Sequence, residues 1–239
     1  MAIGSATGAA STFDRSQAQS SWRFPAAQNI GSHVLSFKRE AESNTPGTAY
    51  VWPIEGTVVI ADLEYTSWDG AQERGWARPN EHREVVQIGA VRLDAGDVFA
   101  ERDAFQMLVR PTVNPELSDY FMQLTGIDNA ALAARGVALE AALTDFATFA
   151  GGLAILSNGA DAAVVTESCG LTGIDNPLPE TRWVDIGPAL KVLLGQRYVG
   201  SAEIPALLGL PVEGPTHDAL ADARAIAAGL RHLRGQGKL

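Results

Sequence analysis

Two carboxylates that stand close together offer the first chemistry in this sequence. Asp62 and Glu64 follow the apolar, β-branched run 57–61 and are separated by one residue. Side chains two positions apart on a strand leave the same face, so these carboxylates would lie side by side. Their repulsion and lost hydration cost stability unless a cation neutralises them, which makes a divalent metal ion one interpretation. The alternative is a pair of acids that does no more than end a strand.

Later acids in the chain each have a chemical and a structural interpretation. Asp161 follows an apolar run, where it can bind a metal ion or cap the next helix. Asp222 stands four residues after Asp218, and it can join a metal site or pair with a nearby arginine. Asp175 and Asp185 look structural, because the first stands in a turn of glycine, asparagine and proline and the second precedes a predicted helix.

His217 is the side chain best suited to accept a proton. It follows the turn at Gly214 and Pro215 and stands near the start of the last predicted helix, for which Thr216 is the expected N-cap. An imidazole with a reference pKa of about 6.5 can take a proton from water close to neutral pH. Taken alone, such a histidine is more often a surface or capping residue.

Hydrophobic spacing predicts the strands and helices that position these groups. Three β-rich segments that follow one another, 57–64, 85–93 and 99–109, should pair antiparallel. Further strands are predicted at 153–156 and 183–185, and helices at 116–124, 139–149, 161–169, 188–194, 203–208 and 216–233. Antiparallel strands followed by alternating strands and helices predict an α/β fold, with a mixed five-stranded sheet flanked by helices.

The composition of the chain bounds its class. It has 239 residues, of which 46% are hydrophobic, and a formal net charge of −10. This balance excludes a wholly disordered chain and argues against passive binding of nucleic acid, which needs clustered lysine and arginine. Residues 1–55 show no sustained hydrophobic periodicity of a helix or strand. They are predicted to be a flexible N-terminal extension of one domain, 56–239. The single Cys169 and the lack of a stretch of about 20 apolar residues predict a soluble, cytoplasmic protein without membrane contact.

The order of the acids and the histidine along the chain is more specific than any one of them. A strand-end Asp-x-Glu, a mid-chain Asp after a strand and a late His-x4-Asp resemble the DnaQ-like 3′-to-5′ exonucleases of the DEDD superfamily, in the subgroup with a histidine (DEDDh). The resemblance spans 58–233. Segments within it are similar to the ERI-type exoribonuclease branch: EVVQIGAV (84–91), FQMLVRP (105–111), PELS (115–118) and LTGI (124–127).

This resemblance implies an RNase H-like fold and metal-dependent cleavage of phosphodiesters. Two Mg²⁺ or Mn²⁺ ions would be held by four acids, with a histidine as the general base, and the matching residues are Asp62, Glu64, Asp161, Asp222 and His217. The products would be nucleoside 5′-monophosphates released from a 3′ end. The chain departs from the ERI-type pattern at Asn158, where an aromatic residue usually follows the position of Ser157. Substrate preference is therefore left open.

Candidate substrate-binding residues lie beside the metal acids and in the LTGI turn. They are Leu63, Tyr65, Thr66, Leu124, Thr125, Gly126 and Ile127. Tyr65 or Trp68 could stack on a base, and a place in the core is an equal alternative for both. The expected partner is the 3′ end of a single-stranded nucleic acid, with RNA or short oligoribonucleotides favoured, and a homodimer is also expected from the resemblance. The alternatives are a DNA-directed exonuclease and a non-catalytic nucleic-acid-binding regulator on the same fold.

Overall fold

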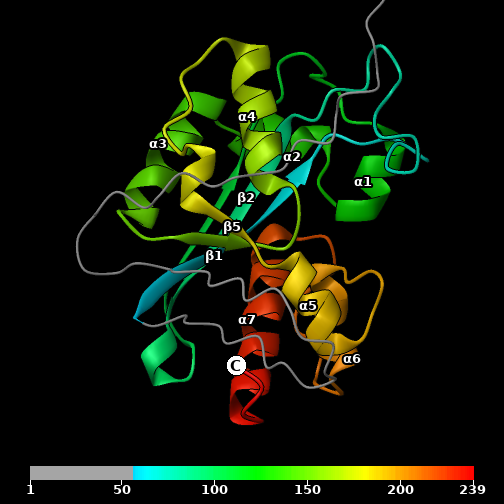
Figure 1. Ribbon diagram of the computed structural model, residues 1–239. Coiled ribbons are helices and arrows are strands. Elements are labelled where there is room, and N and C mark those ends of the chain that lie inside the picture. Colours follow the sequence, from blue (N-terminus) through cyan, green and yellow to red (C-terminus); the bar gives the residue numbers. More distant parts are fainter. Residues whose placement is uncertain (1–55) are drawn as a thin grey trace, which may run out of the picture. The chain divides into compact units, whose positions relative to one another are not determined.

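One mixed sheet organises the part of the chain that the computed structural model describes, residues 56–239. Its five strands are β1 (Thr57–Tyr65), β2 (Val85–Asp94), β3 (Ala100–Leu108), β4 (Ile155–Ser157) and β5 (Trp183–Asp185). They lie in the order β3-β2-β1-β4-β5 (Figure 1), with β1, β2 and β3 antiparallel and β4 and β5 parallel to β1. The predicted mixed five-stranded sheet is confirmed. The extension predicted at 1–55 lies outside the described residues.

Helices cover the sheet and connect its strands (Figure 1). The α-helices of residues 56–239 are α1 (Asp119–Thr125), α2 (Asn129–Arg135), α3 (Leu139–Ala150), α4 (Asp161–Thr172), α5 (Gly187–Leu194), α6 (Ile204–Leu207) and α7 (Ala219–Gly235). Short 3-10 turns occupy Ala95–Asp97, Glu180–Arg182 and Ser201–Glu203. None of the helices in this part of the chain is long and apolar enough to span a membrane.

β1 is buried on both faces because its residues are apolar on both. Val59 and Ala61 belong to the core cluster that contains residues of α3 and α4, including Phe146. Val58 and Ile60 point the other way, into the cluster formed with α5, α6 and α7. Side chains alternate between the two faces of a strand, so residues 62 and 64 lie on the same face as Val58 and Ile60. Both acids therefore face α7.

Side-chain caps set two helix starts that differ from the prediction. α1 begins at Asp119 because the Ser118 hydroxyl accepts a hydrogen bond from the N–H of Phe121, so the helix predicted from 116 starts three residues late. α7 begins at Ala219 because Asp218 is its N-cap, and Thr216 is therefore not the cap that was predicted. In both cases a side chain closer to the helix satisfies the first free N–H groups.

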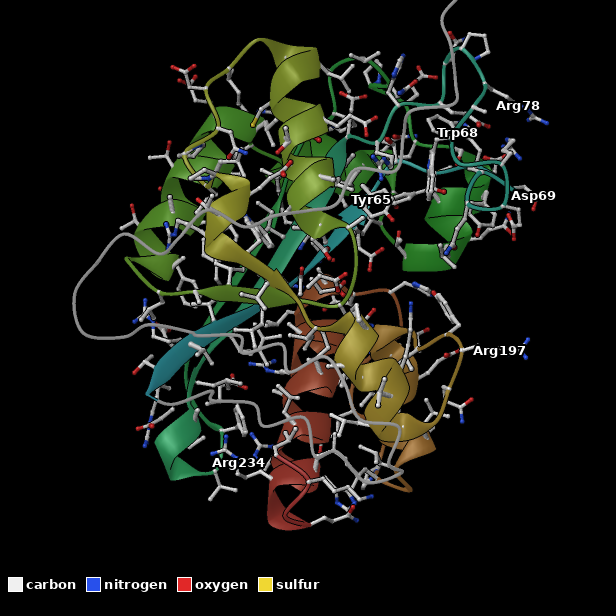
Figure 2. All side chains as sticks on the ribbon, in the orientation of Figure 1. Tyr65, Trp68, Asp69, Arg78, Arg197 and Arg234 are labelled. Carbon is white, nitrogen blue, oxygen red and sulfur yellow. The ribbon has the colours of Figure 1, made fainter. Side chains whose placement is uncertain are left out.

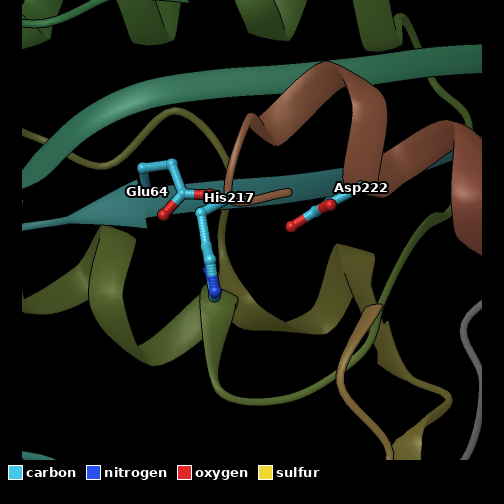
Figure 3. Close-up of side chains that lie close together, drawn as sticks. All are labelled: Glu64, His217 and Asp222. Atoms are coloured by element: carbon cyan, nitrogen blue, oxygen red, sulfur yellow. The ribbon is translucent and has the colours of Figure 1, made fainter. Parts of the chain in front are cut away.

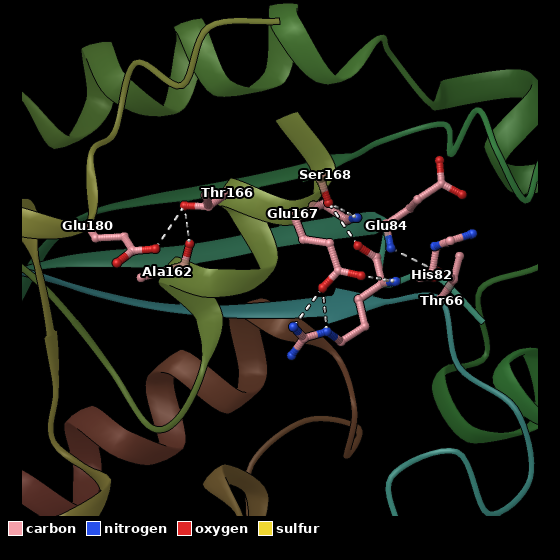
Figure 4. A network of polar contacts seen from close by, with 10 residues as sticks. Thr66, His82, Glu84, Ala162, Thr166, Glu167, Ser168 and Glu180 are labelled. Atoms are coloured by element: carbon pink, nitrogen blue, oxygen red, sulfur yellow. Dashed lines mark hydrogen bonds and ion pairs between the residues drawn. The ribbon is translucent and has the colours of Figure 1, made fainter. Parts of the chain in front are cut away.

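α4 is held to the start of β2 by polar contacts (Figure 4). The Ser168 hydroxyl donates to the carbonyl of Arg83 and accepts from the N–H of Val85, each at 3.1 Å. Glu167 pairs with the Arg83 guanidinium at 2.6 Å. These contacts fix the C-terminal half of α4 against the start of β2. The adjacent Cys169 is buried, as an apolar residue would be.

Candidate active site

β1 presents the first two acids toward α7. Glu64 is 7% exposed, and Asp62 is half-buried two residues before it. Burial raises the pKa of Glu64 to about 8, and the negative charges of Asp222, Asp218 and Asp161 add to this rise. A carboxylate that is both desolvated and surrounded by other acids needs a cation to remain ionised.

Asp161 stands at the first position of α4 and points back toward β1. Ala160 is the N-cap of the helix, so Asp161 is not the cap that the structural alternative proposed. Three donors near its carboxylate stabilise the ionised form and lower its pKa: the N–H of Asp161 itself, the Ser157 hydroxyl and the N–H of Leu63. Burial nevertheless raises the pKa of Asp161 to about 6, since these donors only partly offset the lost hydration.

Asp222 lies in the first turn of α7 and is 5% exposed. Burial raises its pKa to about 7, although the N–H of His217 donates to the carboxylate and stabilises its charge. The alternative that Asp222 pairs with an arginine is wrong for Arg224, which pairs with Glu101 at 2.8 Å.

The four acids act on one another, with Asp62 at the centre of the group. The pKa of Asp62 is raised well above its usual range, first by burial and then by the charges of Asp161, Glu64 and Asp222. The Ser201 hydroxyl donates a hydrogen bond of 2.9 Å to Asp62 Oδ1, which lowers the pKa of Asp62 and partly offsets this rise. Asp62 of β1 thus lies within electrostatic reach of Glu64 on the same strand, of Asp161 on α4 and of Asp222 on α7.

His217 joins this group from the loop before α7. Glu64, His217 and Asp222 offer ligand atoms that all lie within 4.8 Å of one another (Figure 3). The histidine is half-buried, and burial lowers its pKa. The negative charge of Glu203 raises the pKa of His217 and offsets part of this effect. Its backbone has φ of 57°, in the left-handed region that residues other than glycine rarely adopt.

Two glutamines of the sheet hold the start of α7 beside His217. Gln87 Nε2 and Gln106 Nε2 donate to Asp218 Oδ2 at 3.1 and 2.8 Å. Gln87 Oε1 also accepts from the N–H of Ala219 at 2.9 Å. The helix comes so close to β2 that a Cβ on Gly89 would lie 2.1 Å from the Ala219 carbonyl carbon, so only glycine fits there. Sequence reasoning did not assign a role to these glutamines, although both lie inside the segments that carry the family resemblance.

The predicted substrate-binding residues near β1 have mixed surroundings. Leu63 is 4% exposed and packs in the core, while its N–H reaches Asp161. Thr66 is 2% exposed, and its hydroxyl donates to the His82 carbonyl and accepts from the N–H of Glu84 (Figure 4). Tyr65 is half-buried after a β-bulge, with burial and then Asp161 raising its pKa to about 12.

An aromatic and cationic group adjoins Tyr65. The Tyr65 and Trp76 ring centroids are 5.7 Å apart, and the Arg83 guanidinium lies 5.6 Å from the Trp76 ring centroid. Trp68, also considered for stacking, is half-buried in the loop that follows Tyr65 (Figure 2). Trp76 was not predicted, since its place beside Tyr65 depends on how this loop folds back.

The LTGI turn forms the end of α1. Gly126 is its left-handed C-cap with φ of 71°, and the Thr125 hydroxyl donates to the Phe121 carbonyl and accepts from the N–H of Ile127. Leu124 is half-buried and Ile127 is 8% exposed. Each of these residues therefore has a structural role in shaping the turn.

Comparison with known proteins gives the family. The sequence matches the family model described as Exonuclease over residues 59–230. No curated protein matches the sequence. The fold is similar to the nuclease domain of 3′hExo, a DEDDh family member solved bound to rAMP, with a TM-score of 0.65 and 21% identity over 77% of this chain and 94% of that one.

Two further solved structures share the fold. Cell-death related nuclease 4 (CRN-4) has a TM-score of 0.62 and 20% identity over 77% of this chain and 65% of that one. Exonuclease I from E. coli, solved with a dA16 oligonucleotide, has a TM-score of 0.57 and 15% identity over 76% of this chain and 41% of that one. The predicted RNase H-like fold is confirmed by these structures together with the family match. The chain therefore belongs to the exonuclease family, in agreement with the DnaQ-like, DEDDh resemblance of its sequence.

Proposed function

We propose that residues 56–239 form a metal-dependent 3′-to-5′ exonuclease domain that releases nucleoside 5′-monophosphates from single-stranded RNA or short oligoribonucleotides. The observation that carries the proposal is the convergence of Asp62, Glu64, Asp161 and Asp222 on one site, with raised pKa values. The ion pairs of the described residues use other acids, so no basic side chain among them compensates this charge through an ion pair.

The donor set fits divalent ions of the Mg²⁺ and Mn²⁺ kind. Carboxylate oxygens are hard ligands that these ions prefer, and the cations would offset the repulsion that now raises the carboxylate pKa values. In the arrangement we propose, Asp62 would contribute to holding both ions, Glu64 and Asp222 would hold one, and Asp161 would support the other directly or through water. When bound, a pair of such ions activates water and stabilises charge on the phosphate and the leaving oxygen.

His217 is the proposed general base. Its place within 4.8 Å of the ligand atoms of Glu64 and Asp222 puts it beside the acids where the attacking water would be held. Because burial lowers its pKa, the imidazole is neutral near pH 7 and can accept the proton that water loses on attack. Its loop position between the proline-containing turn and α7 would let the ring adjust when a substrate arrives.

The choice of RNA rests on the ERI-type segments of the sequence, and the DNA alternative has support of its own. A structural neighbour, Exonuclease I, was solved with a DNA oligonucleotide, whereas the nuclease domain of 3′hExo was solved with rAMP. Asn158 stands where the ERI-type pattern has an aromatic residue. A DNA-directed exonuclease is therefore the second candidate function, and the same assay separates the two.

The test is cleavage of 5′-labelled single-stranded RNA, single-stranded DNA and duplexes in Mg²⁺, Mn²⁺ or EDTA. We expect a ladder that shortens from the 3′ end of RNA and disappears in EDTA. A stronger ladder on DNA would favour the second candidate. The absence of a ladder on every substrate would leave a non-catalytic binding role and contradict the enzyme proposal.

A histidine substitution tests the site assignment within that assay. His217→Ala should lower turnover by about 10²- to 10⁴-fold, the usual contribution of a general base, without unfolding the protein. His232→Ala is the matched control, because this histidine is half-buried near the far end of α7 and contacts Gln236. Equal rates for the His217 variant and the parent would show that the base has been misassigned.

A further inference from the structure

The side chain of Asn158 is held by hydrogen bonds to residues just before α6. Its Nδ2 donates to the Val199 carbonyl at 2.9 Å and to the Ser201 hydroxyl at 3.3 Å. Ser201 in turn donates to Asp62 Oδ1 at 2.9 Å. A chain of hydrogen bonds therefore runs from the loop after β4 to the acid at the centre of the carboxylate group.

The direction of this chain follows from the chemistry of its members. A carbonyl oxygen can only accept, so the contact with Val199 identifies the Asn158 atom as the amide nitrogen. That nitrogen can only donate, and Ser201 Oγ therefore accepts from it. The serine hydroxyl has a single proton, which is left for Asp62. Asn158 thus orients Ser201 so that the hydroxyl donates to the ionised carboxylate.

The amide of Asn158 is itself confined by its neighbours. A Cβ on Gly187 would lie 3.0 Å from Asn158 Oδ1, so a side chain at this position would crowd the amide. Asp185 Oδ1 accepts from the N–H of Gly159 at 3.0 Å and from the N–H of Gly187 at 2.8 Å, joining the two loops on either side. Asp185 is thus a structural acid, and it keeps the Asn158 loop against the start of α5.

We propose that Ser201 is a positioning residue for Asp62 and that Asn158 orients it. This inference rests on the proposed function, because Asp62 is there the acid that holds both ions. A donated O–H···O⁻ bond favours the ionised carboxylate and restricts its rotation. Residues that hold a metal-binding side chain in this way typically change metal affinity by about 10- to 100-fold when removed.

The inference is tested with Mn²⁺ alone, through titration of the full chain followed by electron paramagnetic resonance of the free ion. Ser201→Ala should bind Mn²⁺ about 10-fold more weakly, and Asn158→Ala should weaken binding by a smaller factor. Ser201→Thr keeps the hydroxyl and should restore most of the affinity. In RNA cleavage, Ser201→Ala should lower kcat at limiting Mn²⁺, recover at high Mn²⁺ and leave KM for RNA unchanged.

Ser168→Ala is the matched control, since it removes an equally specific hydroxyl that contacts Arg83 and Val85 but none of the four acids. Its metal-free melting temperature should fall while its Mn²⁺ affinity stays parental. Parental Mn²⁺ affinity in Ser201→Ala, or an equal loss in Ser168→Ala, would overturn the inference. If Ser201→Ala weakens Mn²⁺ binding but no variant or parent cleaves nucleic acid, the positioning role stands and the proposed function fails.

Discussion

Glu64 shows that the metal-free fold disfavours negative charge in the candidate site. Its carboxyl is 7% exposed and faces Asp222, and its pKa is about 8 against an ordinary value of 4.5. The metal-free protein therefore holds a proton there at neutral pH. Asp161 and Asp222 are shifted in the same direction, to about 6 and about 7. A cation competes with protons for these carboxylates, so metal affinity should rise with pH.

The same shift predicts that the metal-free protein becomes less stable as the pH rises. Below the unfolded pKa of 4.5, Glu64 is protonated in both states and its contribution is fully present. Between pH 4.5 and about 8 Glu64 is ionised in the unfolded chain but still protonated in the folded protein, so the free energy of unfolding falls as the pH rises. The contribution of Glu64 is lost once the pH passes the folded pKa. The loss for this group over that range is on the order of 5 kcal/mol. Thermal unfolding in EDTA at pH 5 and pH 8 measures it.

Glu64→Gln provides the control for that pH dependence. The amide cannot ionise, so its variant should have a flatter pH profile and should be more stable than the parent at pH 8 in EDTA. Added Mn²⁺ should stabilise the parent more than this variant, because a ligand that binds the folded state alone raises its stability. An unchanged pH profile in the variant would contradict the assignment of the shift to Glu64.

The start of α7 is the element on which the site depends most, since it carries both Asp222 and the loop of His217. Gln87 is 4% exposed and holds this start through Asp218 and the N–H of Ala219. Gln87→Leu should leave that buried N–H unpaired and lower the free energy of unfolding by about 1–3 kcal/mol. Urea unfolding measures the change, and kcat should fall as well because α7 shifts.

Gln106→Leu is the comparison for Gln87. Gln106 is exposed and makes one of these contacts, to Asp218, so its loss should cost less than about 1 kcal/mol. Equal destabilisation by the two substitutions would show that the contact to the Ala219 N–H does not hold the helix.

Elements with a clear hydrophobic period could be predicted from the sequence, and contacts between distant segments could not. β1 and β2 are apolar and β-branched, and α3 has its buried residues at helical spacing, so their positions are local properties. α2 has seven residues, NAALAAR, with one buried side chain, Leu132, and it lacked a period to reveal it.

The same distinction applies to the candidate site: some of its residues could be predicted from the sequence, and others depend on contacts between distant segments. Its acids and histidine could be proposed from residue type and order along the chain. Ser201 is 139 residues from Asp62, and Gln87 is 132 residues from Ala219. Both are common polar residue types whose partners are distant in sequence, so only the folded chain shows what they contact.

Across the whole chain, the net charge of −10 limits how nucleic acid can be held. Several arginine side chains make intramolecular contacts. Arg83 pairs with Glu167, Arg224 pairs with Glu101, and Arg231 donates to the Phe99 carbonyl. Arg197 is exposed and points away from the ribbon near the loop that leads to Ser201 (Figure 2). Such a surface favours contact at the 3′ end over a long grip along a strand.

Substrate length and salt test this limit. KM for single-stranded RNA should change little between oligonucleotides of roughly 5 and 20 nucleotides, because few phosphates are contacted. For the same reason, raising salt from about 50 to 200 mM should weaken binding by less than about 10-fold. A KM that falls steeply with length, or a steep salt dependence, would indicate an extended basic track instead.

The left-handed backbone of His217 has a consequence for comparing related chains. A non-glycine residue with φ of 57° holds strain, which fits the role that we propose for the imidazole beside Glu64 and Asp222. Glycine or asparagine adopts this conformation more easily. A descendant that lost the reaction would gain stability by changing this one position, so the residue found there should separate active members of a lineage from those that kept only the fold.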